Sequence, residues 1–439
     1  MKNLLLAVLF VAAPAAAASD VLKPDLFEWR LDNGLDVVYL GAHKAPVVTV
    51  QVWYHVGSKD EQIGQRGSAH MFEHMMFKGT RFVRPEQHAR MISSIGGKID
   101  AFTREDCTAY VDTVPKGDLD FALRLEADRM RNLLIRKEIV DTEREVVKEE
   151  RRLRIDGSPV ARALERFRQI AYTKHPYQWL PAGTLEDLDH LKGSDLRHFY
   201  DTYYRPNNAV LVVVGDVDEA DVRAAVQRWF GPLEKGPPPP RPAASAVEPP
   251  QTQTRKETVG ASQIGLVIGG YHIPNAKSED IFALQVLANI LAGGDSARLP
   301  QRIVRKDQSG VFAGGQTLIL EDPGLFIVYG IYLKPDQAQR VADALDDEVA
   351  RLGREPVEDA ELLKAKNELS AGFVFGLEGI EGLAAQIGNS KILTDDAGSW
   401  ISDYAKYQAV TAADVQRVAK QYLVPTNQTV VTVPPGGAK

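Results

Sequence analysis

Residues 195–214 of the chain read DLRHFYDTYYRPNNAVLVVV, and residues 414–433 read DVQRVAKQYLVPTNQTVVTV. With an offset of 219 residues, an aspartate, a tyrosine, a proline, an asparagine and a valine coincide in the two stretches. Each stretch predicts an amphipathic helix that ends near the proline, a turn at the asparagine and a β-branched strand. Because the same order of features recurs along both stretches, the sequence indicates a duplicated domain.

The regions around these repeats mix strands with helices. Residues 46–57 and 209–217 predict strands, whereas residues 280–293 and 337–353 predict helices that stop at a glycine. Regular alternation of strand and helix is missing. We therefore expect an α+β fold made of two homologous domains, each with a mixed sheet packed against helices.

Composition predicts where these domains begin and end. Residues 236–256 are rich in proline and nearly free of large apolar residues, which is typical of a semi-rigid linker. The linker separates an N-terminal domain, residues 19–235, from a C-terminal domain, residues 257–439. Residues 1–18 carry Lys2, an apolar run and small alanines, which predicts a cleaved secretory signal peptide and export. An uncleaved anchor is the alternative.

Bulk properties exclude several classes of protein. The chain has 439 residues, of which 44% are hydrophobic and 25% charged, as in globular proteins. The net charge of -7 gives no polybasic face, so we expect no nucleic-acid partner. A single cysteine, Cys107, rules out an internal disulfide. Beyond the signal peptide no apolar run is long enough to predict a membrane span.

Residues 67–79, GSAHMFEHMMFKG, carry the predicted chemistry. His70 and His74 lie on one face of a helix and could hold one zinc ion, and Glu73 lies about 60° from His70 around the axis. This order, H-x-x-E-H, is the inverse of the familiar H-E-x-x-H. Two histidines at this spacing also occur by chance. However, the surrounding residues are apolar, and burying these three polar groups without a partner is costly. We therefore predict a zinc site with Glu73 as general base.

A catalytic zinc ion needs a third protein ligand. Residues 137–154 predict a charged helix with a narrow apolar stripe, and on a helical wheel Glu143 and Glu150 both fall within that stripe. The apolar members of the stripe are Ile139, Val146, Val147 and Leu153. From spacing alone, one of the two glutamates is the third ligand and the other supports it.

These motifs resemble the pitrilysin family of zinc peptidases, which includes insulin-degrading enzyme, the mitochondrial processing peptidase and bacterial periplasmic members. Residues 70–80, 125–130, 175–177 and 203–217 carry the likeness, which spans nearly the whole mature chain. In this family a ligand glutamate follows the H-x-x-E-H motif at a distance that corresponds to Glu150. The resemblance therefore implies that His70, His74 and Glu150 bind one Zn²⁺. It also implies that Glu73 is the general base and that Glu143 supports the ligands without binding the metal itself.

Residues 96–115 resemble the edge strand on which this family binds its substrates. An extended peptide would pair with that strand by β-augmentation, so we expect substrate contacts at residues 100–103, namely Asp100, Ala101, Phe102 and Thr103. The family usually has asparagine where this chain has Asp100, which puts that side-chain contact in doubt. An ordinary strand is the alternative.

Three departures from the family concern the second half of the chain. The family's substrate-binding arginine corresponds to Arg305, but its tyrosine corresponds to Phe312, which has no hydroxyl. The second half also lacks an H-x-x-E-H motif, and the chain is half as long as the family's four-domain clamshells. The resemblance thus implies a heterodimer in which a zinc-free homologous subunit supplies the complete arginine–tyrosine pair. A homodimer is the alternative.

Together these features predict a periplasmic zinc metalloendopeptidase that hydrolyses peptides or unfolded polypeptides in a chamber closed by a second subunit. A non-catalytic core-type subunit of a complex is one alternative, and a peptide-binding subunit without turnover is another. Core-type relatives have generally lost part of the zinc motif, which is intact here.

Overall fold

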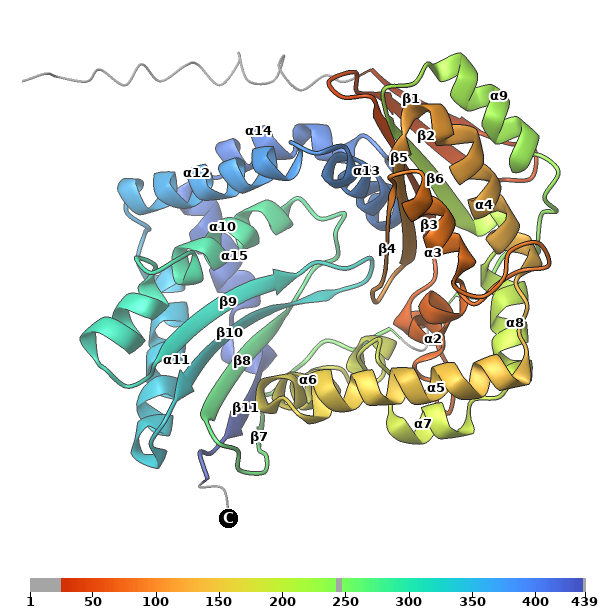
Figure 1. Ribbon diagram of the computed structural model, residues 1–439. Helices are drawn as coiled ribbons and strands as arrows, with labels where there is room; N and C mark the ends of the chain where they lie inside the picture. Colours follow the sequence, from red (N-terminus) through yellow and green to blue (C-terminus); the bar gives the residue numbers. More distant parts are fainter. Residues whose placement is uncertain (1–24, 242–246, 437–439) are drawn as a thin grey trace, which may run out of the picture.

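A computed structural model of the chain describes residues 25–241 and 247–436, so the predicted signal peptide lies outside the described residues. Each half contains one sheet (Figure 1). The first has the strand order β1-β2-β6-β3-β5-β4. Its strands are β1 (Leu26–Arg30), β2 (Asp36–Gly41), β3 (Val47–Tyr54), β4 (Lys98–Thr103), β5 (Thr108–Pro115) and β6 (Ala209–Gly215).

The second sheet has the order β7-β11-β8-β10-β9. Its strands are β7 (Arg255–Thr258), β8 (Gly265–Ile273), β9 (Phe312–Leu318), β10 (Gly324–Tyr332) and β11 (Gln428–Val433). Each sheet has one parallel pair, β2 with β6 and β11 with β7, and is otherwise antiparallel. The predicted α+β class with two mixed sheets is confirmed.

Both halves contain several helices, eight in the described first half and six in the described second half. Those of the first half are α2 (Ser68–Met75), α3 (Gln87–Ser94), α4 (Leu119–Asn132), α5 (Lys137–Arg151), α6 (Pro159–Ala171), α7 (Leu185–His190), α8 (Gly193–Tyr203) and α9 (Glu219–Trp229). Those of the second are α10 (Asp280–Ala292), α11 (Ala338–Arg354), α12 (Asp359–Gly376), α13 (Ile380–Thr394), α14 (Asp403–Ala409) and α15 (Ala412–Tyr422). Helix α15 begins and ends 219 residues after α8, as the sequence repeat requires. Among the described helices, none combines the length and apolar character needed to cross a bilayer.

The two halves exchange helices across their interface. Helix α6 of the first half packs on β8 and β11 of the second sheet, and α13 of the second half packs on β3 and β6 of the first. At each contact an aromatic ring lies against a glycine. Phe167 of α6 meets Gly270, and Trp53 of β3 meets Gly388 of α13. Because each half covers part of the other's sheet, their relative position is fixed by core packing.

Charged side chains on the turn between β9 and β10 add to this interface. Lys59 is buried, lies 2.8 Å from Asp106 and also contacts Glu321 of that turn. The backbone N–H of Glu321 donates to Asp106 at 3.1 Å. The ring of His175 lies 3.1 Å from the Asp322 carboxylate. The sequence motif HPY at residues 175–177 therefore lies at the interface between the two halves.

The described part of the predicted linker lies against the protein. Glu248 accepts hydrogen bonds from the backbone N–H groups of Thr173 and Lys174, at 2.8 and 2.9 Å. Arg241 donates to the backbone oxygen of His55 at 2.7 Å. Strand β7 begins at Arg255, inside the range predicted as linker. These bonds tie the connecting segment to the first half of the chain.

Candidate metal centre

Helix α2 carries the motif and is fixed at both ends. It begins after Gly67, whose φ of 93° lies in the left-handed region that favours glycine. The Glu61 carboxylate accepts from the N–H groups of Gly67 and Ala69, at 2.9 and 2.8 Å, and so caps the start of the helix. The Tyr110 hydroxyl donates to the backbone oxygen of Phe72 at 3.2 Å. The polar face of α2 is thereby held in one orientation.

Helix α5 faces α2 and supplies the acidic residues. It ends at Arg151 and continues as a π-helix, η3 (Arg152–Asp156), whereas the sequence predicted an α-helix through residue 154. The predicted stripe was wrong for Val146 and Leu153, which are 46% and 71% exposed. Glu150 lies on the same side as these two residues, at the border between the core and open space. A π-helix turns by only about 82° per residue, which moves Leu153 further from the core.

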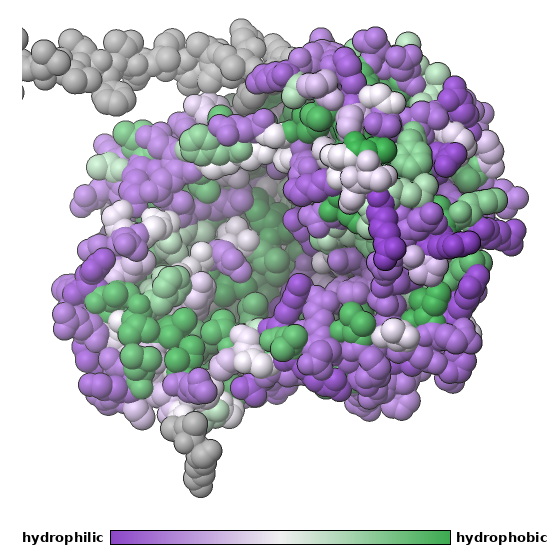
Figure 2. All heavy atoms as spheres, viewed as in Figure 1, coloured by the Kyte–Doolittle hydropathy of each residue, from purple (hydrophilic) through white to green (hydrophobic). Residues whose placement is uncertain are grey.

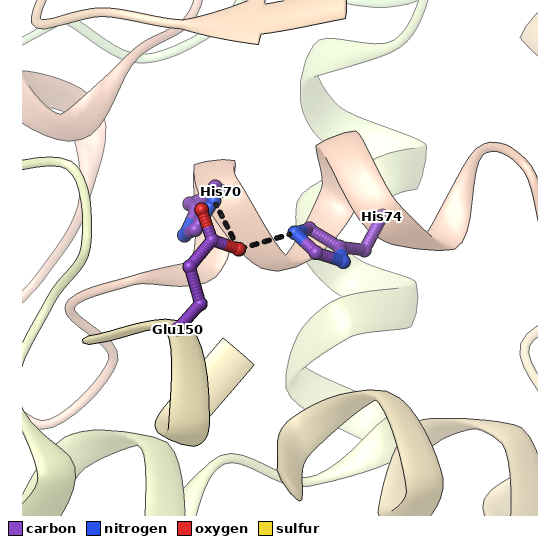
Figure 3. Close-up of side chains that lie close together, drawn as sticks. All are labelled: His70, His74 and Glu150. Carbon is purple, nitrogen blue, oxygen red and sulfur yellow. Dashed lines mark ion pairs between the residues drawn. The ribbon is translucent and has the colours of Figure 1, made fainter. Parts of the chain in front are cut away.

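The two histidines and Glu150 converge on one point (Figure 3). Oε2 of Glu150 lies 3.7 Å from Nε2 of His70 and 3.3 Å from Nε2 of His74. A tetrahedral zinc ion with bonds of 2.0–2.2 Å would hold its ligand atoms about 3.3–3.6 Å apart. Two imidazoles and one carboxylate are also the donor types that zinc prefers. The residues present therefore fit a zinc ion with three protein ligands.

Glu143 lies behind His74 and does not reach the point of convergence. Its Oε2 is 3.6 Å from Nδ1 of His74, and its Oε1 is 2.9 Å from Nζ of Lys78. Burial works to raise the pKa of Glu143, but the contacts with His74 and Lys78 outweigh burial and lower that pKa. An ionised Glu143 can accept the Nδ1–H of His74, which leaves Nε2 as the ligand atom.

The two histidines differ in their surroundings. Burial, followed by the neighbouring His74, lowers the pKa of His70 to about 4, so its ring is neutral at physiological pH. A neutral imidazole is the form that binds a metal. For His74, burial works to lower the pKa, but the contact with Glu143 and the charge of Glu150 outweigh burial and raise it. Two acidic side chains, Glu143 and Glu150, thus act on the pKa of His74.

Glu73 lines the same pocket as the ligands without joining them. Its Oε2 accepts a hydrogen bond of 2.7 Å from the hydroxyl of Thr103 on β4. Burial raises the pKa of Glu73, and the bond from Thr103 offsets part of this shift. A carboxylate whose pKa lies above its usual range and that borders a metal position is suited to accept and return a proton.

The pocket in front of the site has a volume of about 350 Å³. It is lined by His70, Glu73, Ala101, Phe102, Thr103, Glu150, Arg151, Arg154, Ile155, Leu180, Pro181 and Ala182. All of these residues belong to the first half of the chain. The structure therefore brings three of the four predicted edge-strand residues to the pocket, together with His70, Glu150 and the predicted base Glu73, whereas the third predicted ligand, His74, does not line it. Arg305 does not line it but lies exposed on the π-helix η7 (Pro300–Lys306), 3.8 Å from Asp295.

Strand β4 is an open edge of the first sheet, because it pairs only with β5. The N–H of Arg104 donates to the Cys107 oxygen and so points toward β5. Because backbone groups alternate in direction along a strand, the N–H of Ala101, three residues earlier, points to the open edge. That N–H donates to Oδ1 of Asp100 at 2.9 Å. Asp100 itself is exposed and does not line the pocket, but it occupies a donor that an added strand would use.

Sequence reasoning missed several residues of this site. Lys78 follows His74 by four positions and Arg154 follows Glu150 by four, a spacing that places side chains near one another on a helix. That spacing could have found both residues. Residues 180–182 lie in a loop that no local pattern connects to the motif. Next to the predicted Phe312, the structure places Tyr329, with ring centroids 5.9 Å apart.

Comparison with known proteins gives matches along most of the chain. Residues 36–180 match the family described as Insulinase (Peptidase family M16), and residues 190–369 match Peptidase M16 inactive domain. The zinc protease PqqE of Helicobacter pylori is 31% identical over 436 residues, covering 98% of this chain and 97% of that protein. An uncharacterized zinc protease of Streptomyces coelicolor is 29% identical, covering 90% and 86%.

Solved structures share the fold. A protease from Helicobacter pylori superposes with a TM-score of 0.89 at 31% identity, covering 94% of this chain and 100% of that one. The first half of the periplasmic protease PqqL from Escherichia coli gives 0.77 at 20% identity, covering 94% and 93%. Full-length PqqL gives 0.76, also at 20%, and there the match covers 94% of this chain but 48% of PqqL. The fold of this chain thus corresponds to about half of full-length PqqL.

Proposed function

The chain belongs to peptidase family M16, and on that premise we propose that it is a zinc-dependent metalloendopeptidase. The observation that carries the proposal is the convergence of His70, His74 and Glu150 beside a pocket that His70, Glu150 and Glu73 line. Zinc ligands and a general base on one wall are what hydrolysis of a peptide bond requires. The zinc proteases among its relatives support the same assignment.

The three metal ligands, Glu73 and Thr103 each have a role in the proposed reaction. When bound by His70, His74 and Glu150, zinc supplies Lewis acidity, which polarises a carbonyl and makes water reactive near neutral pH. Glu73 accepts the proton of the attacking water on its carboxylate and then gives that proton to the leaving amine. Thr103 holds one oxygen of Glu73 at 2.7 Å and so aims the other toward the pocket.

The substrate is proposed to bind as an added strand on β4. The outward N–H and C=O groups of residues 99, 101 and 103 are available at the open edge, apart from the N–H that Asp100 occupies. Backbone bonds tolerate many sequences, which suits peptides and unfolded polypeptides. The strand position also brings a bound peptide past Glu73, because Thr103 of β4 contacts it.

A second subunit would complete the chamber. The described pocket is lined from one half only, and Arg305 lies apart from it. In Figure 2 the molecule is hollowed between its halves, and apolar side chains gather on the surface of the second half. Val311, Phe312 and Leu333 are among the large apolar residues exposed in that half. Such a patch is typical of a surface that a partner covers. We favour a zinc-free M16 subunit as partner, and a second copy of this chain is the alternative.

The proposed location is the periplasm. Support comes from the predicted signal peptide in residues 1–18 and from PqqL, which is described as a periplasmic protease.

The competing proposal for the function is a peptide-binding or core-type subunit without turnover. The match of the second half to Peptidase M16 inactive domain would also suit that proposal.

One experiment separates these possibilities. The purified mature chain is incubated with a library of quenched fluorescent peptides, alone and with the product of any neighbouring related gene. Zinc content and mass by light scattering are measured on the same samples. Hydrolysis by the chain alone, as a homodimer, would contradict the heterodimer. Zinc binding with hydrolysis only after the second protein is added would support it. Zinc binding without hydrolysis in either sample would favour the non-catalytic subunit.

A further inference from the structure

Arg154 is the most exposed charged side chain of the pocket wall. It lies in the π-helix η3, four residues after the ligand Glu150, and its side chain is 76% exposed. Its Nη1 is 2.6 Å from Oε1 of Glu150, whereas the other oxygen of Glu150 faces the two histidines. Single π-helical turns occur frequently at functional sites. Here the turn brings a guanidinium to the edge of the pocket.

Most donors of this guanidinium have no partner within residues 25–241 and 247–436. The contact with Glu150 uses Nη1, which leaves the N–H groups of Nη2 and Nε available as donors. The neighbouring Arg151 differs, because both of its Nη atoms contact Glu165 at 3.0 Å and Nη1 also donates to the Gly183 oxygen at 2.6 Å. Of the two arginines that line the pocket, Arg151 is buried with both Nη atoms bonded, whereas Arg154 is exposed with Nη2 and Nε open to a further group.

Arg154 and the proposed zinc ion share the charge of Glu150. When Glu150 binds zinc, its carboxylate compensates the charge of Arg154 less than it does alone. The other cations nearby have carboxylates of their own, because Lys78 contacts Glu143 and Glu86, and Arg151 contacts Glu165 and Asp156. The Arg154 guanidinium lies on the pocket wall with the apolar Ile155, Leu180 and Pro181.

We propose that Arg154 is a specificity-determining residue that binds a carboxylate of the substrate peptide. A planar guanidinium matches a carboxylate through two parallel hydrogen bonds, and such charge-assisted bonds are among the strongest in proteins. The carboxylate comes from an acidic side chain near the scissile bond or from the C-terminus of a short peptide. This inference rests on the proposed peptidase function and names a substrate class for it.

The test compares three variants of the mature chain, in whichever assembly is active. Arg154→Gln removes the charge, and Arg154→Lys keeps the charge without the fork. Arg152→Gln is the matched control, because Arg152 lies on the same turn, contacts Glu149 at 3.1 Å and does not line the pocket. Peptides are used in pairs that differ by Glu or Gln at one position, or by a free or amidated C-terminus. The readouts are KM, kcat, peptide affinity by fluorescence anisotropy, and zinc per chain.

We expect the unmodified chain and Arg152→Gln to prefer the acid of a pair by about tenfold in KM and in affinity. Arg154→Gln should lose this preference, Arg154→Lys should keep part of it, and zinc content should stay unchanged. The responding pair identifies a side-chain or a terminal carboxylate. Equal preference in Arg154→Gln and Arg152→Gln, or loss of zinc from Arg154→Gln, would overturn the inference while leaving the peptidase intact. Failure of all peptides to bind or to be cleaved would instead overturn the proposed function, and this inference with it.

Discussion

Trp53 and Gly388 lie so close together that a Cβ atom at position 388 would come within 2.3 Å of the tryptophan ring. Trp53 belongs to β3 in the first half, whereas Gly388 belongs to α13 in the second. The same relationship occurs with the halves reversed, since a Cβ at Gly270 would come within 2.4 Å of Phe167. The exchange of α6 and α13 thus depends on two glycines that admit two large rings.

We predict that Gly388→Ala destabilises the protein, because the added methyl must push the buried Trp53 ring or α13 out of place. Overpacking of this kind costs about 1–3 kcal/mol. Gly372→Ala is the matched control, since Gly372 lies within α12 and a Cβ there would meet nothing within 4 Å. That control should be neutral or more stable by up to about 1 kcal/mol. Denaturant unfolding measures both, and equal stability of the two variants would contradict the packing argument.

We predict that Glu73→Gln retains zinc but loses hydrolysis by a factor of about 10²–10⁴, because an amide cannot accept the proton of the attacking water. Zinc per chain and kcat are measured on the same preparation. Glu138→Gln on the exposed side of α5 serves as the control and should behave as the unmodified chain. Unchanged turnover in Glu73→Gln would remove Glu73 from the role of base.

We predict that Glu143→Gln binds zinc about 10–100-fold more weakly, because His74 loses the carboxylate that orients its ring. Glu145→Gln makes the same chemical change on the same helix, at a side chain that is 63% exposed and contacts Lys148. Competition with a chelator of known affinity gives both dissociation constants. A weakening of the same size in Glu145→Gln would show that the helix, rather than His74, had been affected.

Local periodicity was enough to predict much of this protein. Strands β3 and β6 and helices α10 and α11 lie close to the predicted ranges, because each is encoded by the spacing of apolar residues within one segment, whereas α5 ends before the predicted residue 154. Glu150 was placed beside the histidines by the resemblance and is there in the structure. Spacing alone could not choose between Glu143 and Glu150, because both lie on one face of α5. The choice depends on which residues of other elements each glutamate contacts.

Contacts between distant segments could not be predicted from one sequence. No local pattern indicates the contacts of His88 and His175, yet one is buried beside Asp112 and the other joins the two halves through Asp322. In both cases the partner lies on another element, and a periodic pattern says which face is buried but not what covers it. The exposure of Leu153 depends on a π-helical turn that apolar spacing does not encode.

We predict that Asp100→Ala lowers the KM for peptides by about two- to fivefold, because the outward N–H of Ala101 no longer bonds to the Asp100 carboxylate. Asp100→Asn can keep that bond through its amide oxygen and should behave as the unmodified chain. Lys98→Ala, an exposed residue on the same face of β4, is the control. An increase in KM for Asp100→Ala would indicate instead that Asp100 contacts the substrate directly.

A buried ionic cluster in the first half makes stability depend on pH. His88 of α3, Asp112 of β5, and Glu126 and Arg129 of α4 are all less than 5% exposed. Burial lowers the pKa of His88 to about 3, so its ring is neutral. Two carboxyl groups then face one guanidinium, and the cluster is neutral only if one of them keeps its proton. Burial raises the pKa of both carboxyl groups, and because that of Glu126 rises from 4.5 to about 7 we assign the retained proton to Glu126.

We therefore predict that the stabilisation contributed by Glu126 is lost as the pH rises from about 4.5 through about 7, whereas His88, whose pKa is lowered, contributes in the opposite direction. Between these values the folded chain holds a proton on Glu126 that the unfolded chain has released, so the stabilisation is complete below pH 4.5 and disappears above the folded pKa. A shift of this size corresponds to roughly 3 kcal/mol. Glu126→Gln cannot ionise, so its stability relative to the unmodified chain should rise by about that amount between pH 5 and pH 8. Denaturant unfolding at four pH values, with Glu145→Gln as control, measures this difference. A difference that stays constant with pH would show that Glu126 is ionised throughout.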